Sequence, residues 1–131
     1  MIYTSYFANL KNIPEEIVPI AISGSVPNFY KGIQYKRLAP RWETLTRYKQ
    51  SGDKDAFIKD YYKYVLDGLD ANRVIQDLIE LSNGKDIALI CWESPEKFCH
   101  RHLIAKWIFD KTGTHRVVEF DKDAYLKADL L

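Results

Sequence analysis

Residues 86–92 read DIALICW, a continuous apolar run typical of a parallel β-strand that is buried on both faces. The polar segment Glu93–Lys97 follows, and apolar residues then recur at helical spacing. These residues are Cys99, Leu103, Ile104, Trp107 and Ile108. His115–Phe120 (HRVVEF) has the composition of another strand. A strand, a polar turn, a helix and a strand make a βαβ unit, and such units build parallel sheets.

Two strands and three helices are expected before this unit. Ile2–Phe7 and Ile17–Ile22 are β-branched and aromatic runs that end in turn-forming residues. Apolar residues recur at helical spacing in three segments, Arg41–Gln50, Ala56–Leu69 and Asn72–Leu81. The sequence therefore predicts an α/β fold with a three-layer, Rossmann-like arrangement, in which helices flank a small, mostly parallel sheet.

Length and composition indicate one globular unit. The chain has 131 residues, of which 47% are hydrophobic and 28% are charged, and it contains no repeat or linker. We expect a single domain over residues 1–131, with a disordered or loosely packed tail from about residue 122. The apolar runs are far shorter than the ~20 residues that cross a bilayer, and the N-terminus lacks a secretory pattern. We therefore expect a cytoplasmic protein with no membrane partner.

The chain has two cysteines, Cys91 and Cys99, which lie close together in sequence. A disulfide between them would close a very small loop and stabilise the fold little, so we expect free thiols in a reducing compartment. Buried cysteines are common in protein cores, and packing is the favoured interpretation of both. A thiol beside a helix N-terminus and an arginine is nevertheless biased towards the reactive thiolate.

The clearest chemical signal lies at the carboxyl end of the strand at residues 86–92, where ligands bind in open parallel sheets. Cys91 and Glu93 occupy this end, and Cys99, His100 and Arg101 begin the next helix. The free N–H groups of a first helical turn, together with the guanidinium of Arg101, favour an anion. Four residues that follow the first two strands are expected to line the same rim: Ser5, Tyr6, Ser23 and Gly24.

The candidate catalytic residues are Glu93, His100 and Cys91, and the candidate ligand-binding residues are Arg101, Cys99 and the four rim residues. Glu93 is either the ion-pair partner of Arg101 or a general base or hydroxyl acceptor. His100 is either a helix cap or an acid–base group. Residues two apart on a strand share one face, so Cys91 is expected to be the last covered residue and Glu93 the first exposed one. We therefore expect Glu93 to be functional and Cys91 mainly to pack. Because an unpaired buried charge is costly, we expect Arg101 to contact Glu93 or an anion.

No metal site or other cofactor is expected from the spacing of these residues. Cys-x7-Cys-His-x-His matches none of the usual zinc patterns, and side chains adjacent on a helix, such as Cys99 and His100, point about 100° apart. No P-loop, GxGxxG turn, GxSxG elbow or HExxH pair is present. The phosphatase signature loop also fails, because Lys97 stands where that loop requires arginine.

The pattern Cys91-x-Glu93-x5-Cys99-His100-Arg101 resembles that of the domain-of-unknown-function family 488. The segments Ile2–Pro14 (IYTSYFANLKNIP), Arg37–Lys49 (RLAPRWETLTRYK) and Leu78–Leu89 (LIELSNGKDIAL) are similar to that family as well. The resemblance covers most of the chain, from about Ile2 to Ile108. It implies a small α/β protein of cytoplasmic or phage origin, and it implies a site at the motif residues without a settled activity.

Two functions compete at this point. The first is an enzyme or binding protein for a small anionic or nucleotide-like ligand, with Arg101 on the anion and Glu93 on a hydroxyl or acting as a base. The alternative is a nucleic-acid-binding or phage–host interaction module. It rests on the basic stretch Lys31–Lys49, in which aromatic residues that could stack bases are interleaved. These aromatic residues are Tyr30, Tyr35, Trp42 and Tyr48. A structural or redox role for the two thiols is a third possibility.

Overall fold

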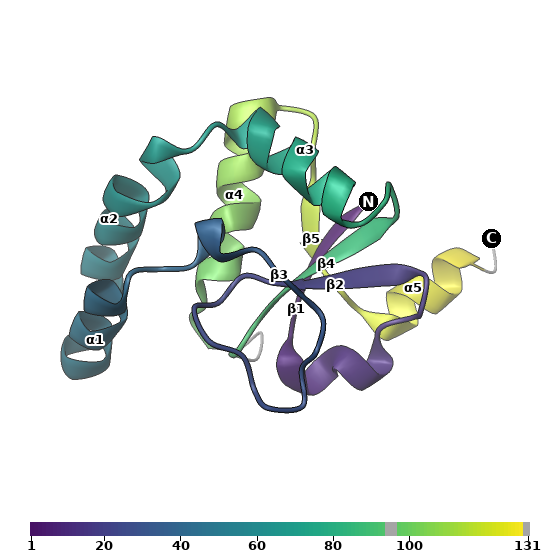
Figure 1. Ribbon diagram of the computed structural model, residues 1–131, viewed down its shortest axis with the longest axis horizontal. Coiled ribbons are helices and arrows are strands. Elements are labelled where there is room, and N and C mark those ends of the chain that lie inside the picture. The colour runs from purple at the N-terminus through teal and green to yellow at the C-terminus, as the bar shows by residue number, and fades with distance from the viewer. Residues whose placement is uncertain (94–96, 130–131) are drawn as a thin grey trace.

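A five-stranded sheet forms the centre of the protein in a computed structural model that describes residues 1–93 and 97–129 (Figure 1). The strands are β1 (Ile2–Tyr6), β2 (Ile17–Ala21), β3 (Ile33–Gln34), β4 (Asp86–Cys91) and β5 (Val117–Glu119). Their order across the sheet is β3-β2-β4-β1-β5, and every neighbouring pair is parallel. The four strands predicted from the sequence are confirmed, and the short edge strand β3 is an addition to them.

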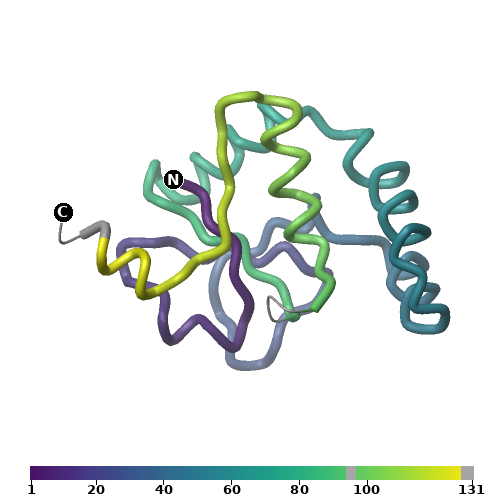
Figure 2. The backbone as a smooth tube through the Cα atoms, turned by 180° about the vertical axis from the view of Figure 1, so that it is seen from behind, coloured from purple at the N-terminus to yellow at the C-terminus, as the bar shows by residue number. Residues whose placement is uncertain are grey.

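Helices cover both faces of this sheet. The α-helices are α1 (Trp42–Ser51), α2 (Lys54–Tyr64), α3 (Ala71–Leu81), α4 (His100–Thr112) and α5 (Lys122–Asp129). The 3-10 helices are η1 (Phe7–Asn12), η2 (Lys36–Leu38) and η3 (Leu66–Gly68). In both views α3 and α4 lie beside each other along the sheet, and α1 and α2 form a pair at the end of the molecule away from α5 (Figures 1 and 2). The predicted three-layer, Rossmann-like α/β fold is confirmed.

Side-chain alternation along β4 divides the core into two layers. Ile87, Leu89 and Cys91 pack into a large cluster with residues of α2, α3 and α4. Ala88 and Ile90 pack on the opposite face, in a smaller cluster with residues of η1 and the segment after β5. Because the strand is buried on both faces, its sequence is a continuous apolar run rather than an alternating one. The same alternation turns Cys91 towards the α3–α4 layer.

Local capping explains where several helices begin and end. The side chains of Asp53 and Asp70 accept hydrogen bonds from backbone N–H groups at the starts of α2 and α3. After α1 the chain turns at Gly52, whose positive φ of 67° suits glycine. The helix predicted over residues 56–69 ends at Tyr64, and a separate 3-10 turn, η3, follows it.

The last part of the described chain forms a helix. Tyr125 of α5 packs its ring against Tyr3 and Phe120, and its hydroxyl donates to a carboxylate oxygen of Glu16 at 2.6 Å. Within residues 1–93 and 97–129, no helix is both long enough and apolar enough to cross a bilayer. That the whole chain is one domain stays a prediction.

Candidate functional site

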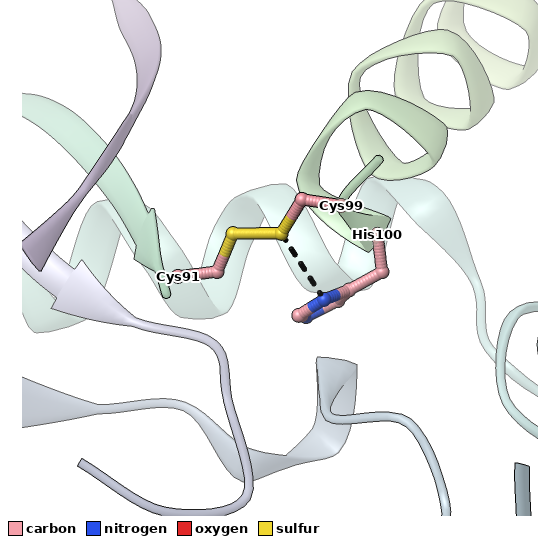
Figure 3. Close-up of side chains that lie close together, drawn as sticks. All are labelled: Cys91, Cys99 and His100. Carbon is pink, nitrogen blue, oxygen red and sulfur yellow. Dashed lines mark hydrogen bonds between the residues drawn. A yellow bond between two sulfur atoms is a disulfide. The ribbon is translucent and has the colours of Figure 1, made fainter. Parts of the chain in front are cut away.

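The site begins where β4 ends and α4 starts, and there the structure joins Cys91 to Cys99 by a disulfide (Figure 3). The prediction of free thiols is therefore wrong. That prediction considered only the small loop that the bond closes. In the fold, Cys91 is the last residue of β4, and Cys99 directly precedes α4, so the βαβ geometry itself brings the two sulfurs together. Both side chains are buried.

His100 lies beside this disulfide, and its environment determines its protonation. Its Nε2 lies 2.9 Å from the backbone oxygen of Ile22, and because a carbonyl only accepts, Nε2 carries the proton. The other ring nitrogen, Nδ1, lies 3.7 Å from Sγ of Cys99, and Figure 3 shows the ring turned towards that sulfur. The pKa of His100 is lowered to about 4, chiefly by burial, which outweighs the opposing effect of the hydrogen bond to Ile22, and the charges of Arg101 and His102 lower it further. The imidazole is therefore neutral at neutral pH, with its free lone pair facing the sulfur.

Arg101 is fully buried and pairs with a residue that the sequence analysis did not single out. Its Nε and Nη2 donate to the two carboxylate oxygens of Glu119, each at 3.0 Å, and this fork-like contact is the strong form of an arginine–carboxylate pair. Glu119 ends β5, and it also accepts from the hydroxyl of Thr4 at 2.6 Å. The guanidinium is thereby fixed between β1, β5 and α4.

The remaining nitrogen of Arg101 points back to the end of β4. Nη1 donates to Sγ of Cys91 at 3.0 Å and to the backbone oxygen of Glu93. Arg101 therefore contacts Glu93 as expected, but through the backbone oxygen of that residue, and its carboxylate partner is Glu119. With no exposed surface, Arg101 holds the site together from behind rather than facing a ligand.

A pocket of about 750 Å³ opens above the two cysteines and His100. We call Cys91, Cys99 and His100 the pocket floor. One side is formed by Trp42 and Tyr48 of α1, Phe57 of α2 and Phe98, which we call the aromatic wall. The remaining lining residues are Ser23, Gly24, Ser25, Pro40, Leu45, Lys49, Trp92 and Glu93. An apolar concavity with a few convergent polar groups is the usual form of a small-molecule site.

The rings of the aromatic wall support one another. Phe98 lies 5.3 Å from Tyr48 and 5.1 Å from Phe57, measured between ring centroids. These contacts connect the α1–α2 pair to the segment just before α4. Trp42 differs from the other three, because 74% of its surface is exposed at the edge of the pocket.

A family model described as the active DUF488-N3 subclade matches residues 11–112. The chain belongs to the DUF488 family. The resemblance noted from the cysteine, glutamate, histidine and arginine motif is confirmed, and the matched segment includes every residue of the pocket floor and the aromatic wall. No curated protein and no solved structure matches the chain.

Not all rim residues predicted for this DUF488 protein reach the pocket. Ser23 and Gly24 line it, as expected from their place after β2. Among the described residues, Ser5 and Tyr6 are not part of the lining, and their predicted place on this rim is wrong. Ser5 is buried, and its hydroxyl accepts from Asn9 of η1 at 3.0 Å, on the other side of the sheet from the floor. Tyr6 lies beside the guanidinium of Arg101, whose central carbon is 5.6 Å from the ring centroid.

Glu93 stands where the alternation along β4 placed it. Cys91 is 1% exposed, whereas Glu93 is exposed and lines the pocket. The intervening Trp92 turns the other way, packs its ring 5.1 Å from Phe7 and donates its indole N–H to the backbone oxygen of Ser25 at 3.0 Å. Trp92 thereby connects the end of β4 to the loop after β2. The functional role of Glu93 stays a prediction. The centre of the polar segment at 93–97 lies outside the described residues.

The aromatic residues associated with the basic stretch at residues 31–49 do not form one exposed row in the structure. Tyr30 and Tyr35 are buried, and their hydroxyls donate to the backbone oxygen of Ile33 and to the carboxylate of Asp77. They are therefore not available to stack exposed bases. Trp42 and Tyr48 line the pocket instead. One of the basic groups, Arg47, is paired with Asp60 at 2.8 Å.

The pocket floor also has the donor set of a metal site. Single ligand atoms of Cys91, Cys99 and His100 all lie within 4.8 Å of one another. No such cluster was expected from the sequence, because the side chains of Cys99 and His100 diverge when both residues belong to a helix. Cys99 is instead the extended residue before α4, with φ −147° and ψ 145°, so the two side chains converge.

Proposed function

We propose that the pocket of this DUF488 protein binds a small molecule with a planar, nucleobase-like group. We propose further that this molecule reacts at the pocket floor, formed by Cys91, Cys99 and His100. The observation that carries this proposal is the arrangement of aromatic side chains around a buried polar floor. Aromatic rings stack on the faces of bases and contribute about 1–3 kcal/mol per base. The polar groups around the floor supply directional contacts of the kind that fix a ligand's orientation.

The polar groups in this pocket have distinct chemical capacities. Glu93 offers a carboxylate for a ring N–H or a ribose hydroxyl, and Lys49 offers a cation for a phosphate. His100 has no ring nitrogen free to contact a ligand, because Nε2 donates to the backbone oxygen of Ile22 and Nδ1 faces the sulfur of Cys99. We therefore propose Glu93 and Lys49 as the first ligand contacts and the floor as the reacting side.

This assignment revises the anion site that the sequence suggested. Arg101 is buried against Glu119, so an anionic group is proposed to lie at Lys49, on the rim, rather than at the start of α4. The description of the matched family as active agrees with a reacting site rather than a purely structural one. A cytoplasmic location, where thiol reductants are abundant, is part of the same proposal.

Nucleic-acid binding has less support than a small-molecule pocket. Two of the four aromatic residues proposed to stack bases are buried, and the other two line a concave pocket rather than an open groove. The two functions differ in their salt dependence, because contacts with many phosphates release many counterions.

The experiment is a thermal-shift screen of the purified chain against nucleobases, nucleosides, nucleotides and short oligonucleotides. A specific ligand at 100 times its dissociation constant should stabilise the protein by about 2.7 kcal/mol. The stabilisation should be clearly smaller in Trp42→Ala and unchanged in Phe109→Ala, a matched control at an exposed aromatic residue on α4 outside this pocket. Stabilisation only by oligonucleotides, with a steep loss at higher salt, would contradict the proposal.

A further inference from the structure

The pocket floor brings three ligand atoms, two sulfurs and one ring nitrogen, close together from two separate elements. Cys91 ends β4, whereas Cys99 and His100 stand at the start of α4, and all three are buried (Figure 3). We propose that, when the disulfide is reduced, these three residues bind one Zn²⁺ ion whose fourth coordination position opens into the pocket. Two thiolates, one imidazole and one open position form a recurrent arrangement for zinc in catalytic sites. The inference does not depend on the identity of the pocket's organic ligand.

The hydrogen bond of His100 prepares the ring for a metal. Metal-bound imidazoles usually donate their other N–H to a carbonyl or carboxylate, which fixes the tautomer and the orientation of the ring. Here the backbone oxygen of Ile22 receives that N–H from Nε2 at 2.9 Å. Nδ1 is left with its lone pair directed at the sulfur of Cys99.

The surroundings of Cys91 suit a metal-bound thiolate. Nη1 of Arg101 donates to Sγ of Cys91 at 3.0 Å, and a hydrogen bond of this kind stabilises a negatively charged sulfur. Glu119 holds the other two guanidinium nitrogens, so Arg101 keeps this direction whether or not a metal is bound. The charges of two thiolates and Zn²⁺ cancel, as do those of Arg101 and Glu119, and no net charge is left buried.

The distance between the ring nitrogen of His100 and the sulfur of Cys99 agrees with tetrahedral coordination. With Zn–S near 2.3 Å and Zn–N near 2.05 Å, a tetrahedral angle places the sulfur and the nitrogen about 3.6 Å apart. Sγ of Cys99 and Nδ1 of His100 lie 3.7 Å apart. The Cα atoms of Cys91 and Cys99 are separated by 7.4 Å, more than the roughly 4.4–6.8 Å usual for disulfides. This backbone spacing leaves room for an ion between the two sulfurs.

The redox state of Cys91 and Cys99 determines whether the floor holds a disulfide or two thiols that can bind a metal. A dithiol reductant transfers two electrons and two protons to the sulfurs of Cys91 and Cys99, and it leaves as its own disulfide. Binding of Zn²⁺ then displaces both thiol protons into the solvent. In the oxidised chain the sulfurs are bonded to each other and cannot act as thiolates. Metal binding should therefore require reduction.

The test is a titration of the reduced full-length chain with Co²⁺ and then Zn²⁺ under anaerobic conditions. One equivalent of Co²⁺ should produce the thiolate-to-cobalt charge-transfer band and the visible bands of a tetrahedral site. Zn²⁺ should abolish these bands, because it binds nitrogen and sulfur sites more tightly than Co²⁺. Native mass spectrometry should then show one zinc per chain, and the oxidised chain should bind none.

Three variants separate this site from adventitious binding. Cys99→Ser and His100→Gln should each weaken Zn²⁺ binding by more than about 100-fold, since even loss of an outer-shell partner costs 10- to 100-fold. His115→Ala, at a histidine near the other end of α4, should bind as the wild type does, and far-ultraviolet circular dichroism should confirm that all three fold.

Two outcomes would overturn the proposal. One is a reduced wild-type chain that binds no metal, and the other is equal binding by Cys99→Ser and wild type. The nucleobase screen uses metal-free, oxidised protein, so its outcome is independent of this one.

Discussion

The pocket floor and the aromatic wall face the same space but are held in different ways. Each polar group at the floor has a fixed partner, since His100 donates to Ile22, and Arg101 behind Cys91 is paired with Glu119. Trp42 of the wall is 74% exposed. Buried polar groups are costly to disturb, whereas exposed side chains contribute little to folding. Substitutions at the floor should therefore alter both the stability of the fold and the reactivity of the site. Substitutions at the exposed part of the wall should alter ligand binding alone.

The largest effect is expected from removal of the carboxylate behind the floor. Glu119→Ala leaves the guanidinium of Arg101 buried without its partner, and breaking a buried pair in this way costs about 3–5 kcal/mol. Urea unfolding should show this loss, with an intermediate value for Glu119→Gln. The control is Glu43→Ala, which removes an exposed partner of Arg41 and should cost at most about 1 kcal/mol. An equal decrease of the unfolding free energy in Glu119→Ala and Glu43→Ala would contradict the claim that the buried pair contributes more than the exposed pair.

A pH-dependent effect of somewhat smaller size is expected from His100. Its pKa is lowered to about 4 in the folded chain, from an ordinary value of 6.5 for a solvated histidine. Between these values the unfolded chain binds the proton and the folded chain does not, so stability decreases as the pH falls from about 6.5 to 4. The full contribution is about 3 kcal/mol.

Unfolding of the oxidised, metal-free protein by urea at pH 7, 5.5 and 4.5 measures this contribution. His100→Gln should flatten this part of the profile, although carboxyl groups still titrate at its lower end. His102→Gln is the matched control at a half-exposed histidine and should change the slope less, although burial and Arg101 lower its pKa as well. A wild-type profile that is flat over this range would contradict the buried, neutral state of His100.

Within the wall, Trp42→Ala should separate binding from folding. The unfolding free energy should change by no more than about 0.5 kcal/mol, because the side chain is mostly exposed. Affinity for the ligand found in the screen should fall by about 5- to 150-fold, the equivalent of one lost stacking contact of 1–3 kcal/mol. Calorimetric titration of both proteins measures the difference. Unchanged affinity would place the ligand elsewhere.

The smallest change in stability is expected at Glu93. Its side chain is exposed at the rim, so Glu93→Gln should fold as the wild type does, within about 0.5 kcal/mol. Loss of a charged hydrogen bond to the ligand should weaken binding by roughly 10- to 100-fold. The same calorimetric titration, with Glu15→Gln as an exposed control outside the pocket, tests this expectation.

The sequence was sufficient to predict the layers of the fold and the meeting of Cys91, Cys99 and His100 where β4 ends and α4 begins. The apolar run at 86–92 indicated a central parallel strand, and the helical spacing after it indicated α4. Side-chain alternation along β4 correctly separated the buried Cys91 from the exposed Glu93. These signals are local, so they can be read from neighbouring residues.

The errors concern contacts between distant segments. The pairing of Arg101 with Glu119 depends on β5 lying beside β1, and nothing in the segment HRVVEF reveals that register. The aromatic wall depends on how α1 and α2 pack against Phe98. The error at Cys99 was a single-residue boundary, because one position outside the helix turns the side chain towards Cys91 rather than away from it.

The central claim, that the aromatic pocket above the floor is the ligand site, is tested most directly by tryptophan fluorescence. Titration with the ligand found in the screen should quench the emission of the wild type, and the double variant Trp42→Phe/Trp92→Phe, which removes both tryptophans that line the pocket, should lose this change. Trp107→Phe should retain it, because Trp107 is 1% exposed and lies in the core outside the pocket. Quenching that persists in Trp42→Phe/Trp92→Phe and disappears in Trp107→Phe would contradict the account.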